Sequence, residues 1–168
     1  MSNRTETTVT LAFPPAKVAE ALTSEAYWKY NVANLSSEPG EVHQFTTSEG
    51  GCEAVLYEVM PMELLPEAVR AMVSQSLKIK RVVTWNYLDT PAPTGNYTAD
   101  VKGAPVDFAA EMSLTGDDNT TTITYQNVVN VNIPFMGSAI EPKVSEALDE
   151  LTANEARLTE TWIKENLA

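Results

Sequence analysis

Seven short segments of the sequence alternate apolar and polar residues with period two, and this pattern constrains the fold more than any other feature. Such alternation is typical of strands with one buried face. We expect strands at residues 7–13, 41–47, 52–60, 77–88, 95–101, 106–114 and 120–133. Short connections rich in Gly, Asn and Asp separate most of them, so neighbouring strands are expected to pair as hairpins. The sequence therefore predicts an antiparallel sheet.

The turns also predict which residues lie opposite one another, and so which share a face. Three closures give these pairs: Tyr97 with Ala110 across turn 103–104, Met112 with Ile123 and Ala110 with Tyr125 across turn 117–118, and Trp85 with Tyr97 across loop 89–93. The opposed side chains are apolar or aromatic in every pair. We therefore expect one apolar face that spans four strands and must be covered.

A long helix near the C-terminus is predicted to cover this face. Apolar residues recur at three- and four-residue intervals near the C-terminus, at Ile140, Val144, Leu148, Leu151, Leu158 and Trp162. Ser138 and Glu141 fit a capping box at the start of this pattern, so a long helix over about 138–167 is predicted. Shorter helices are expected from Pro15 to about Thr23, around Tyr27, Trp28 and Leu35, and from Pro66 to Val73 between the third and fourth strands. The prediction is an α+β fold in which a long helix lies on a curved sheet.

Length and composition indicate one domain over residues 1–168. The chain has 43% hydrophobic and 20% charged residues, which is the balance of a globular protein. Its formal charge of −12 would repel phosphate backbones and anionic surfaces, so nucleic acid is not expected as a partner. The small basic group at Lys78, Lys80 and Arg81 is split between two faces by strand alternation.

Cysteine and histidine content excludes several classes of site. Cys52 and His43 are the single representatives of their types, so disulfides, Cys-rich zinc clusters and multi-histidine metal sites are excluded, and no cofactor is predicted. No signal-peptide pattern or membrane-length apolar run occurs, so a cytoplasmic location without integral membrane association is expected. A dyad of Cys52 with His43 is disfavoured, because a turn near Glu49 places them at least four residues apart along a strand, roughly 13 Å.

The order of elements resembles the helix-grip fold of the START-like superfamily, which includes polyketide cyclases and birch-pollen-allergen-like proteins (SRPBCC). Several segments are similar to an uncharacterised actinobacterial branch: residues 21–28 (ALTSEAYW), Leu65-Pro66, Thr84-Trp85, and residues 133–137 (IPFMG) running into Ile140-Glu141. The resemblance implies a seven-stranded sheet wrapped around the C-terminal helix and a cavity between them. In this superfamily the cavity holds sterols, lipids, polyketides or plant hormones, but no catalytic residues carry over.

Two polar residues fall in the apolar phase of predicted strands. Arg81 would be costly to bury unpaired, so it holds an anionic head group in a cavity, pairs with Glu58 or reaches water at a strand end. Asn127 is either a ligand contact or an amide satisfied by a neighbour. The remaining pocket candidates are aromatic or apolar and would also serve as plain core: Trp85, Tyr97, Phe108, Met112 and Tyr125.

Three functions are compatible with these residues. The leading hypothesis is non-catalytic binding or transport of a hydrophobic or amphipathic small molecule by a monomer or homodimer. A second is a cyclase- or aromatase-type enzyme in which Glu58 moves a proton and polar side chains orient the substrate, from the set Arg81, Asn127, Tyr57, Tyr97 and Tyr125. A third is a protein-interaction module anchored by Trp28 and Trp162, which would otherwise pack helix ends onto the sheet.

Overall fold

The computed structural model describes residues 2–35, 39–60, 67, 71, 77–102, 106–131 and 137–167. The helices and strands follow in this order: β1 (Ser2–Leu11), α1 (Pro15–Leu22), α2 (Glu25–Asn34), β2 (Glu41–Ser48), β3 (Gly51–Met60), β4 (Leu77–Asn86), β5 (Thr94–Lys102), β6 (Val106–Gly116), β7 (Thr121–Val131) and α4 (Gly137–Asn166).

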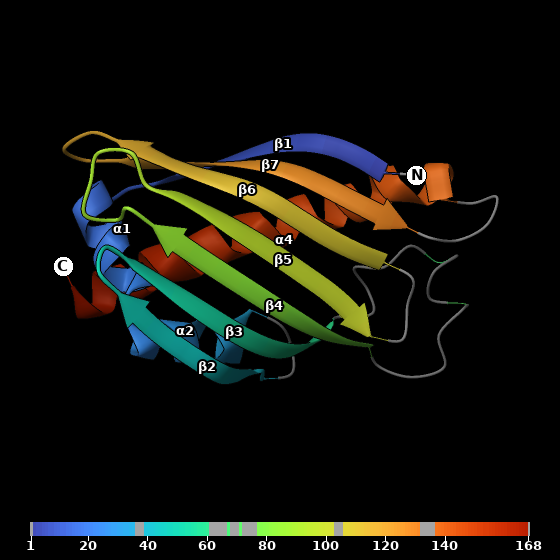
Figure 1. Cartoon of the computed structure of the whole chain (residues 1–168), viewed down its shortest axis with the longest axis horizontal. Coiled ribbons are helices and arrows are strands. Elements are labelled where there is room, and N and C mark those ends of the chain that lie inside the picture. The colour runs from blue at the N-terminus through green and yellow to red at the C-terminus, as the bar shows by residue number, and fades with distance from the viewer. Residues whose placement is uncertain are drawn as a thin grey trace.

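The seven strands form a single curved sheet in the order β1-β7-β6-β5-β4-β3-β2, with every adjacent pair antiparallel. The long helix α4 crosses one face of this sheet, and α1 and α2 lie near its C-terminal end (Figure 1). We call the face toward α4 the inner face. The helix-grip fold expected from the sequence is confirmed.

Alternation along each strand separates the two faces. Inner-face residues of β5, β6 and β7 are buried, apart from the partly buried Val101, and alternate with exposed or partly exposed neighbours. The outer face is rich in threonine and other polar side chains. Because a strand turns successive side chains to opposite sides, this pattern alone commits the sheet to one covered face.

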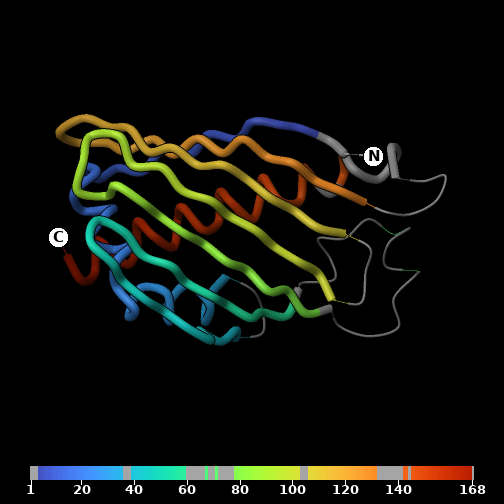
Figure 2. Tube along the Cα trace, viewed as in Figure 1, coloured from blue at the N-terminus to red at the C-terminus, as the bar shows by residue number. Residues whose placement is uncertain are grey.

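Buried side chains hold the C-terminal end of the helix α4. Ile163 is fully buried there, and the ring of Trp162 meets that of Tyr27 edge to face, with 5.7 Å between centroids. Farther back, α4 packs mainly on β1 and β7. Figure 2 shows the helix running diagonally behind the strands toward α1.

The predicted pairing of β4 with β5 is wrong by two residues. Trp85 lies opposite Gly95, and Tyr97 lies opposite Val83. The strand ends at Asn86 rather than Leu88, because Tyr87 takes a left-handed backbone conformation (φ 59°). Continued alternation from Trp85 would place Tyr87 on the apolar face, but its side chain is 63% exposed. The longer loop shifts the pairing by two residues. Because side chains alternate with a period of two, those within the strands stay on their predicted face.

The β6–β7 hairpin closes differently from the prediction for a similar reason. Met112 lies opposite Tyr125, and Ala110 lies opposite Asn127. The loop has four residues instead of two, since the Asp117 carboxylate accepts hydrogen bonds from the amides of Asn119 and Thr120, both at 2.8 Å. The β5–β6 register is confirmed, with Tyr97 opposite Ala110.

The remaining boundaries agree with the sequence to within a few residues, except that β1 begins at Ser2 rather than Thr7. Its first half has no apolar alternation and is fixed by pairing with the end of β7. The predicted helix from Pro66 to Val73 lies mostly outside the described residues; within it, the Ala71 amide donates to the Glu67 carbonyl at 3.0 Å. The side chains of the predicted capping box also lie outside them.

One edge of the sheet is interrupted. In β2 the pairing with β3 shifts between Val42 and Gln44, so His43 is the extra residue of a bulge. His43 is exposed, and most of β2 is exposed with it.

Candidate functional site

A buried arginine lies at the centre of the inner face. Strand alternation puts Arg81 between Ile79 and Val83, and the side chain is 1% exposed. On the adjacent strand the same alternation turns Glu58 inward, where its side chain is 3% exposed. Register places Glu58 opposite Ile79, one diagonal step from Arg81, and the two side chains form an ion pair. The predicted pairing of these residues is confirmed.

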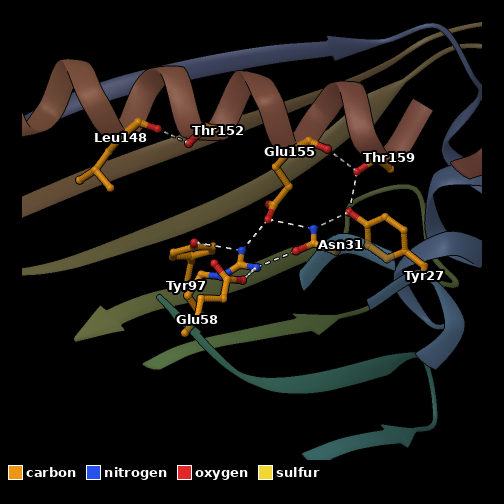
Figure 3. A network of polar contacts seen from close by, with 9 residues as sticks. Tyr27, Asn31, Glu58, Tyr97, Leu148, Thr152, Glu155 and Thr159 are labelled. Carbon is orange, nitrogen blue, oxygen red and sulfur yellow. Dashed lines mark hydrogen bonds and ion pairs between the residues drawn. The ribbon is translucent and has the colours of Figure 1, made fainter. Parts of the chain in front are cut away.

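The guanidinium is held by four groups from four elements (Figure 3). Its Nη1 donates to Glu155 Oε2 at 2.5 Å and to the Tyr97 hydroxyl at 3.2 Å. Its Nη2 donates to Asn31 Oδ1 at 2.6 Å and to Glu58 Oε1. Among the described residues, Nε has no acceptor. The head of Arg81 is therefore saturated at both terminal nitrogens.

A second tier of hydrogen bonds ties α2 to α4 through the same network. Asn31 Nδ2 donates to Glu155 Oε2 and to the Tyr27 hydroxyl, both at 3.1 Å. The Tyr27 and Thr159 hydroxyls lie 2.6 Å apart, and Thr159 donates to the Glu155 carbonyl at 2.8 Å. These bonds fix the rotamer of Glu155, whose side chain is 14% exposed.

Burial shifts the protonation equilibria of the cluster. It raises the pKa of Glu58, an effect that the charge of Arg81 opposes. It likewise raises the pKa of Tyr97 and that of Tyr27. Burial disfavours the charged form of Arg81, but Tyr97, Glu58 and Glu155 outweigh it and leave the pKa of Arg81 above its ordinary value. The tyrosines are therefore neutral and Arg81 is charged at neutral pH.

Two small hollows lie between the sheet and α4, and Glu155 borders both. We call them the distal and proximal hollows. The distal hollow, about 10 Å³, is lined by Tyr97, Phe108, Tyr125, Leu148, Leu151, Thr152 and Glu155. The proximal hollow, about 20 Å³, reaches toward α1 and α2, and its lining includes Trp85, Met112, Tyr125, Ala156 and Thr159. Each has room for about one water.

The open cavity implied by the resemblance is therefore absent from the described part of the interior. Large side chains fill the space instead, among them Trp85 and Tyr97, which are 2% and 8% exposed. A larger hollow, about 510 Å³, lies open on the outer face, where Ala109 is flanked by longer polar side chains such as Arg4, Asn96, Glu111 and Gln126.

The predicted pocket residues are not all brought together. Five of them line the two interior hollows: Trp85, Tyr97, Phe108, Met112 and Tyr125. Arg81 lines neither and lies beneath Glu155. Asn127 is engaged elsewhere, because its Nδ2 donates to the Thr7 hydroxyl on β1 at 2.7 Å. The interpretation of Asn127 as an amide satisfied by a neighbour is confirmed.

Sequence reasoning missed Glu155, Asn31, Tyr27 and Thr159 as members of the cluster. A signal for two of them was present in the helical spacing, where Glu155 and Thr159 follow Leu151 at successive four-residue steps. Polar residues in a stripe that should bury apolar ones resemble Arg81 in its strand. The partner of such a residue cannot be identified from spacing alone.

The other candidates have structural surroundings. Cys52 lies opposite Thr47 and donates to the Leu22 carbonyl at 3.1 Å, far along the strand from His43, so no dyad forms. Burial raises the pKa of the Cys52 thiol to about 11. Trp28 and Trp162 are buried within the chain, which leaves neither free as an anchor for a partner.

Two kinds of site are not found in the described parts of the chain. No group of three or more His, Cys, Asp or Glu side chains gathers there in a way that could hold a metal ion. None of the helices that the structure describes combines the length and apolar character needed to cross a membrane.

Solved structures share the fold at low sequence identity. The Zhui aromatase/cyclase from Streptomyces sp. R1128 superposes with a TM-score of 0.64 at 9% identity, covering 100% of this chain and 97% of its own. TTHA0849 from Thermus thermophilus gives 0.63 at 10% identity, covering 99% and 100%. Ara h 8.0201 gives 0.61 at 13% identity, covering 99% and 100%. These likenesses establish the fold and leave the activity open.

Sequence relatives cover almost the whole chain. Uncharacterised proteins of Mycobacterium tuberculosis and Mycobacterium bovis are 24% identical over 158 residues, which is 90% of this chain and 91% of theirs. A family model described as "Protein of unknown function (DUF2505)" matches residues 6–163. The chain is thus a helix-grip protein and belongs to the DUF2505 family.

Proposed function

We propose that this protein binds a small amphipathic molecule between the inner face of the sheet and α4, without converting it. The guest would be lipid-like, sterol-like or polyketide-like in its apolar part. The observation that carries the proposal is the position of Glu155, which joins a buried ionic network yet borders both interior hollows. The polar end of the guest would lie against Glu155 and Tyr97.

A purely structural role explains this cluster poorly. Replacing a buried ion pair or triad by apolar residues of similar volume is often neutral or stabilising, so a buried cluster gives weak support for stability. Polar groups that converge beside aromatic and apolar walls are the usual composition of a small-molecule site. The inner face around the distal hollow has that composition, with Phe108 and Tyr125 beside Tyr97 and Glu155.

The interior must widen to admit such a guest, and α4 is the element suited to move. Its middle turns present the polar or small side chains Thr152, Glu155 and Ala156 to the hollows, beside Leu148 and Leu151. Its C-terminal end is fixed by Trp162 and Ile163. A small outward displacement of the middle would uncover part of the two leucines, a cost that the apolar part of the guest would offset, while the end stays docked.

Native mass spectrometry of the protein purified from its own host tests the proposal. We expect a retained small molecule that is released on denaturation. The variant Thr152→Leu/Ala156→Leu fills both hollows and should emerge empty, whereas Thr161→Leu, at an exposed position on α4, should keep the molecule. Recovery of wild-type protein without any bound molecule, or equal retention by the filled variant, would contradict binding at this place.

A cyclase- or aromatase-type reaction is the second candidate, and one observation favours it. Glu155 and the Tyr97 hydroxyl border the same hollow and meet at Arg81 Nη1, so a carboxylate and a phenol converge on one point. A shared fold with an aromatase/cyclase is compatible with this. Incubating the recovered molecule with wild-type protein and with Glu155→Gln separates the two functions, since binding returns it unchanged and catalysis yields a product only with the wild type.

The proposal extends to location and assembly. A buried thiol that forms no disulfide is consistent with a reducing cytoplasm. Because both tryptophans expected to anchor a partner are buried in the chain, binding does not require a second subunit, and the protein would act as a monomer or as a homodimer of independent sites.

A further inference from the structure

We infer that the guest's polar group is a protonated amine, rather than a carboxylate or a phosphate. This inference rests on the proposed function and specifies the chemistry of the same site. It is the opposite of one of the two alternatives drawn from the sequence, in which Arg81 would hold an anionic head group. The reason lies in how Arg81 is already paired.

The cluster has no positive charge to offer. One guanidinium faces two carboxylates, Glu58 and Glu155, and both form ion pairs with it. If both carboxyl groups are ionised the cluster carries −1, and if one is protonated it is neutral. In neither state would an incoming anion find a compensating charge, so the free-energy cost of removing it from water would not be offset.

The donors of Arg81 are also occupied or turned away. Both terminal nitrogens are engaged by Glu155, Tyr97, Asn31 and Glu58. Only Nε lacks an acceptor among the described residues, and Arg81 lines neither hollow. A group entering either hollow meets the carboxylate of Glu155 before it reaches the guanidinium.

The hollows offer acceptors and ring faces instead. Glu155 uses Oε2 for both Arg81 and Asn31, while none of the described residues donates to its Oε1. Around the distal hollow stand three aromatic rings, and those of Tyr97 and Phe108 meet at 75° with centroids 5.4 Å apart. The Tyr97 ring already faces the Arg81 guanidinium, 5.9 Å from Cζ to its centroid, so the rings of Phe108 and Tyr125 are the ones offered to a guest. A carboxylate oxygen beside angled aromatic rings matches the recognition of an ammonium group, because ring faces and carboxylate both attract a cation.

Three matched probes test this chemistry: 4-phenylbutylamine, 4-phenylbutanol and 4-phenylbutanoate, titrated into the intact protein by calorimetry. We expect the amine to bind at least about ten-fold more tightly than the carboxylate, with the alcohol between them. Tighter binding of the carboxylate would overturn the amine inference and leave the proposed function standing. Failure of all three to bind would overturn both.

The charge of −12 would attract any cation to the surface, so a matched pair of variants is needed. Glu155→Gln and Glu150→Gln remove the same charge from one helix, the first at the hollows and the second at an exposed position. We expect Glu155→Gln to weaken the amine about ten-fold and the alcohol less than two-fold, and Glu150→Gln to change neither by two-fold. Equal losses in the two variants would show surface attraction only and overturn the inference.

A second variant, away from the ion pairs, tests the same inference in case Glu155→Gln disturbs the fold. Phe108→Leu removes one ring of the distal hollow and retains an apolar side chain. Loss of the ring should weaken the amine by several-fold more than the alcohol, since only the cation uses the ring's electrostatic attraction. Parallel losses for amine and alcohol would count against an ammonium in this hollow.

Discussion

At the scale of single residues, Arg81 has the most unusual environment in the described chain. Strand alternation commits its side chain to the inner face, where it is 1% exposed and depends on Glu58 and Glu155 for its charge balance. Each member of such a cluster is destabilising if left alone, because an unpaired buried charge keeps its desolvation penalty. Two predictions follow from this dependence.

Replacing Arg81 by Met should lower the free energy of unfolding by about 3–5 kcal/mol, because two acidic groups would then be buried without their cation. The triple variant Arg81→Met/Glu58→Leu/Glu155→Leu removes the charges together and should be clearly more stable than the single variant. Urea denaturation followed by circular dichroism measures both. A triple variant less stable than Arg81→Met alone would contradict the cost assigned to the two carboxyl groups left without their cation.

Glu58 should make stability depend on pH. Its folded pKa lies above the ordinary 4.5, with burial the largest cause, so the folded protein binds this proton more tightly than the unfolded chain does. The stability contributed by this carboxyl is present below about pH 4.5 and is lost as pH rises through the folded pKa. The unfolding free energy of the wild type minus that of Glu58→Gln should therefore fall with rising pH.

Urea titrations of the two proteins at several pH values from roughly 4 to 8 measure this difference, and carboxyl groups common to both cancel. A difference that grows with pH would mean that Arg81 lowers the pKa of Glu58 more than burial raises it.

At the scale of elements, the length of each turn determined whether the strand partners predicted from the sequence were correct. Face assignments came out right within the four strands for which they were made, β4 to β7, because alternation has a period of two and a slip of two residues preserves it. Exact partners were wrong in two hairpins. A left-handed Tyr87 and the Asp117 side chain lengthened the loops, and both depend on local backbone conformations that composition does not specify.

The candidate site was predictable only where its members were neighbours in the sheet. Arg81 with Glu58 could be inferred from adjacent strands with one shared face. Glu155 lies 74 residues from Arg81, and Asn31 lies 50 residues away on α2. Which helical residues reach a given point of a sheet depends on the crossing and depth of the helix, and these are set by packing of the whole domain.

Gly95 tests the observed register of β4 and β5. It lies opposite Trp85, and an added Cβ would lie 2.5 Å from the Thr84 carbonyl oxygen and 2.9 Å from Met112 Cε. We expect Gly95→Ala to destabilise the protein by about 1–3 kcal/mol through overpacking. Asn96→Ala, at an exposed position on the same strand, should stay within about 0.5 kcal/mol. Similar denaturation midpoints for the two variants would contradict close packing at Gly95.

At the scale of the whole molecule, the charge of −12 opposes folding through repulsion between surface carboxylates. Raising NaCl from about 0.01 M to about 0.1 M shortens the screening length from roughly 30 to 10 Å. We expect the melting temperature to rise by about 2–4 °C, which corresponds to roughly 1 kcal/mol for a chain of this size. The buried Arg81 pairs are screened far less than surface charges.

Differential scanning calorimetry at fixed pH measures this shift, with sucrose at matched osmolality as the uncharged control. A falling melting temperature would mean that exposed attractive pairs, such as Lys29 with Glu25 at 3.2 Å, outweigh the net repulsion.

The bulge in β2 has a consequence for how these molecules behave when crowded together. An open sheet has two border strands, and each can template growth by accepting a strand from another copy. At the β2 border the extra residue His43 disrupts the regular ladder, leaving only Gln44–Ser48 in unbroken register. At this border a strand of another copy would therefore meet a regular ladder of five residues, shorter than the roughly six or seven residues typical of fibril-forming segments.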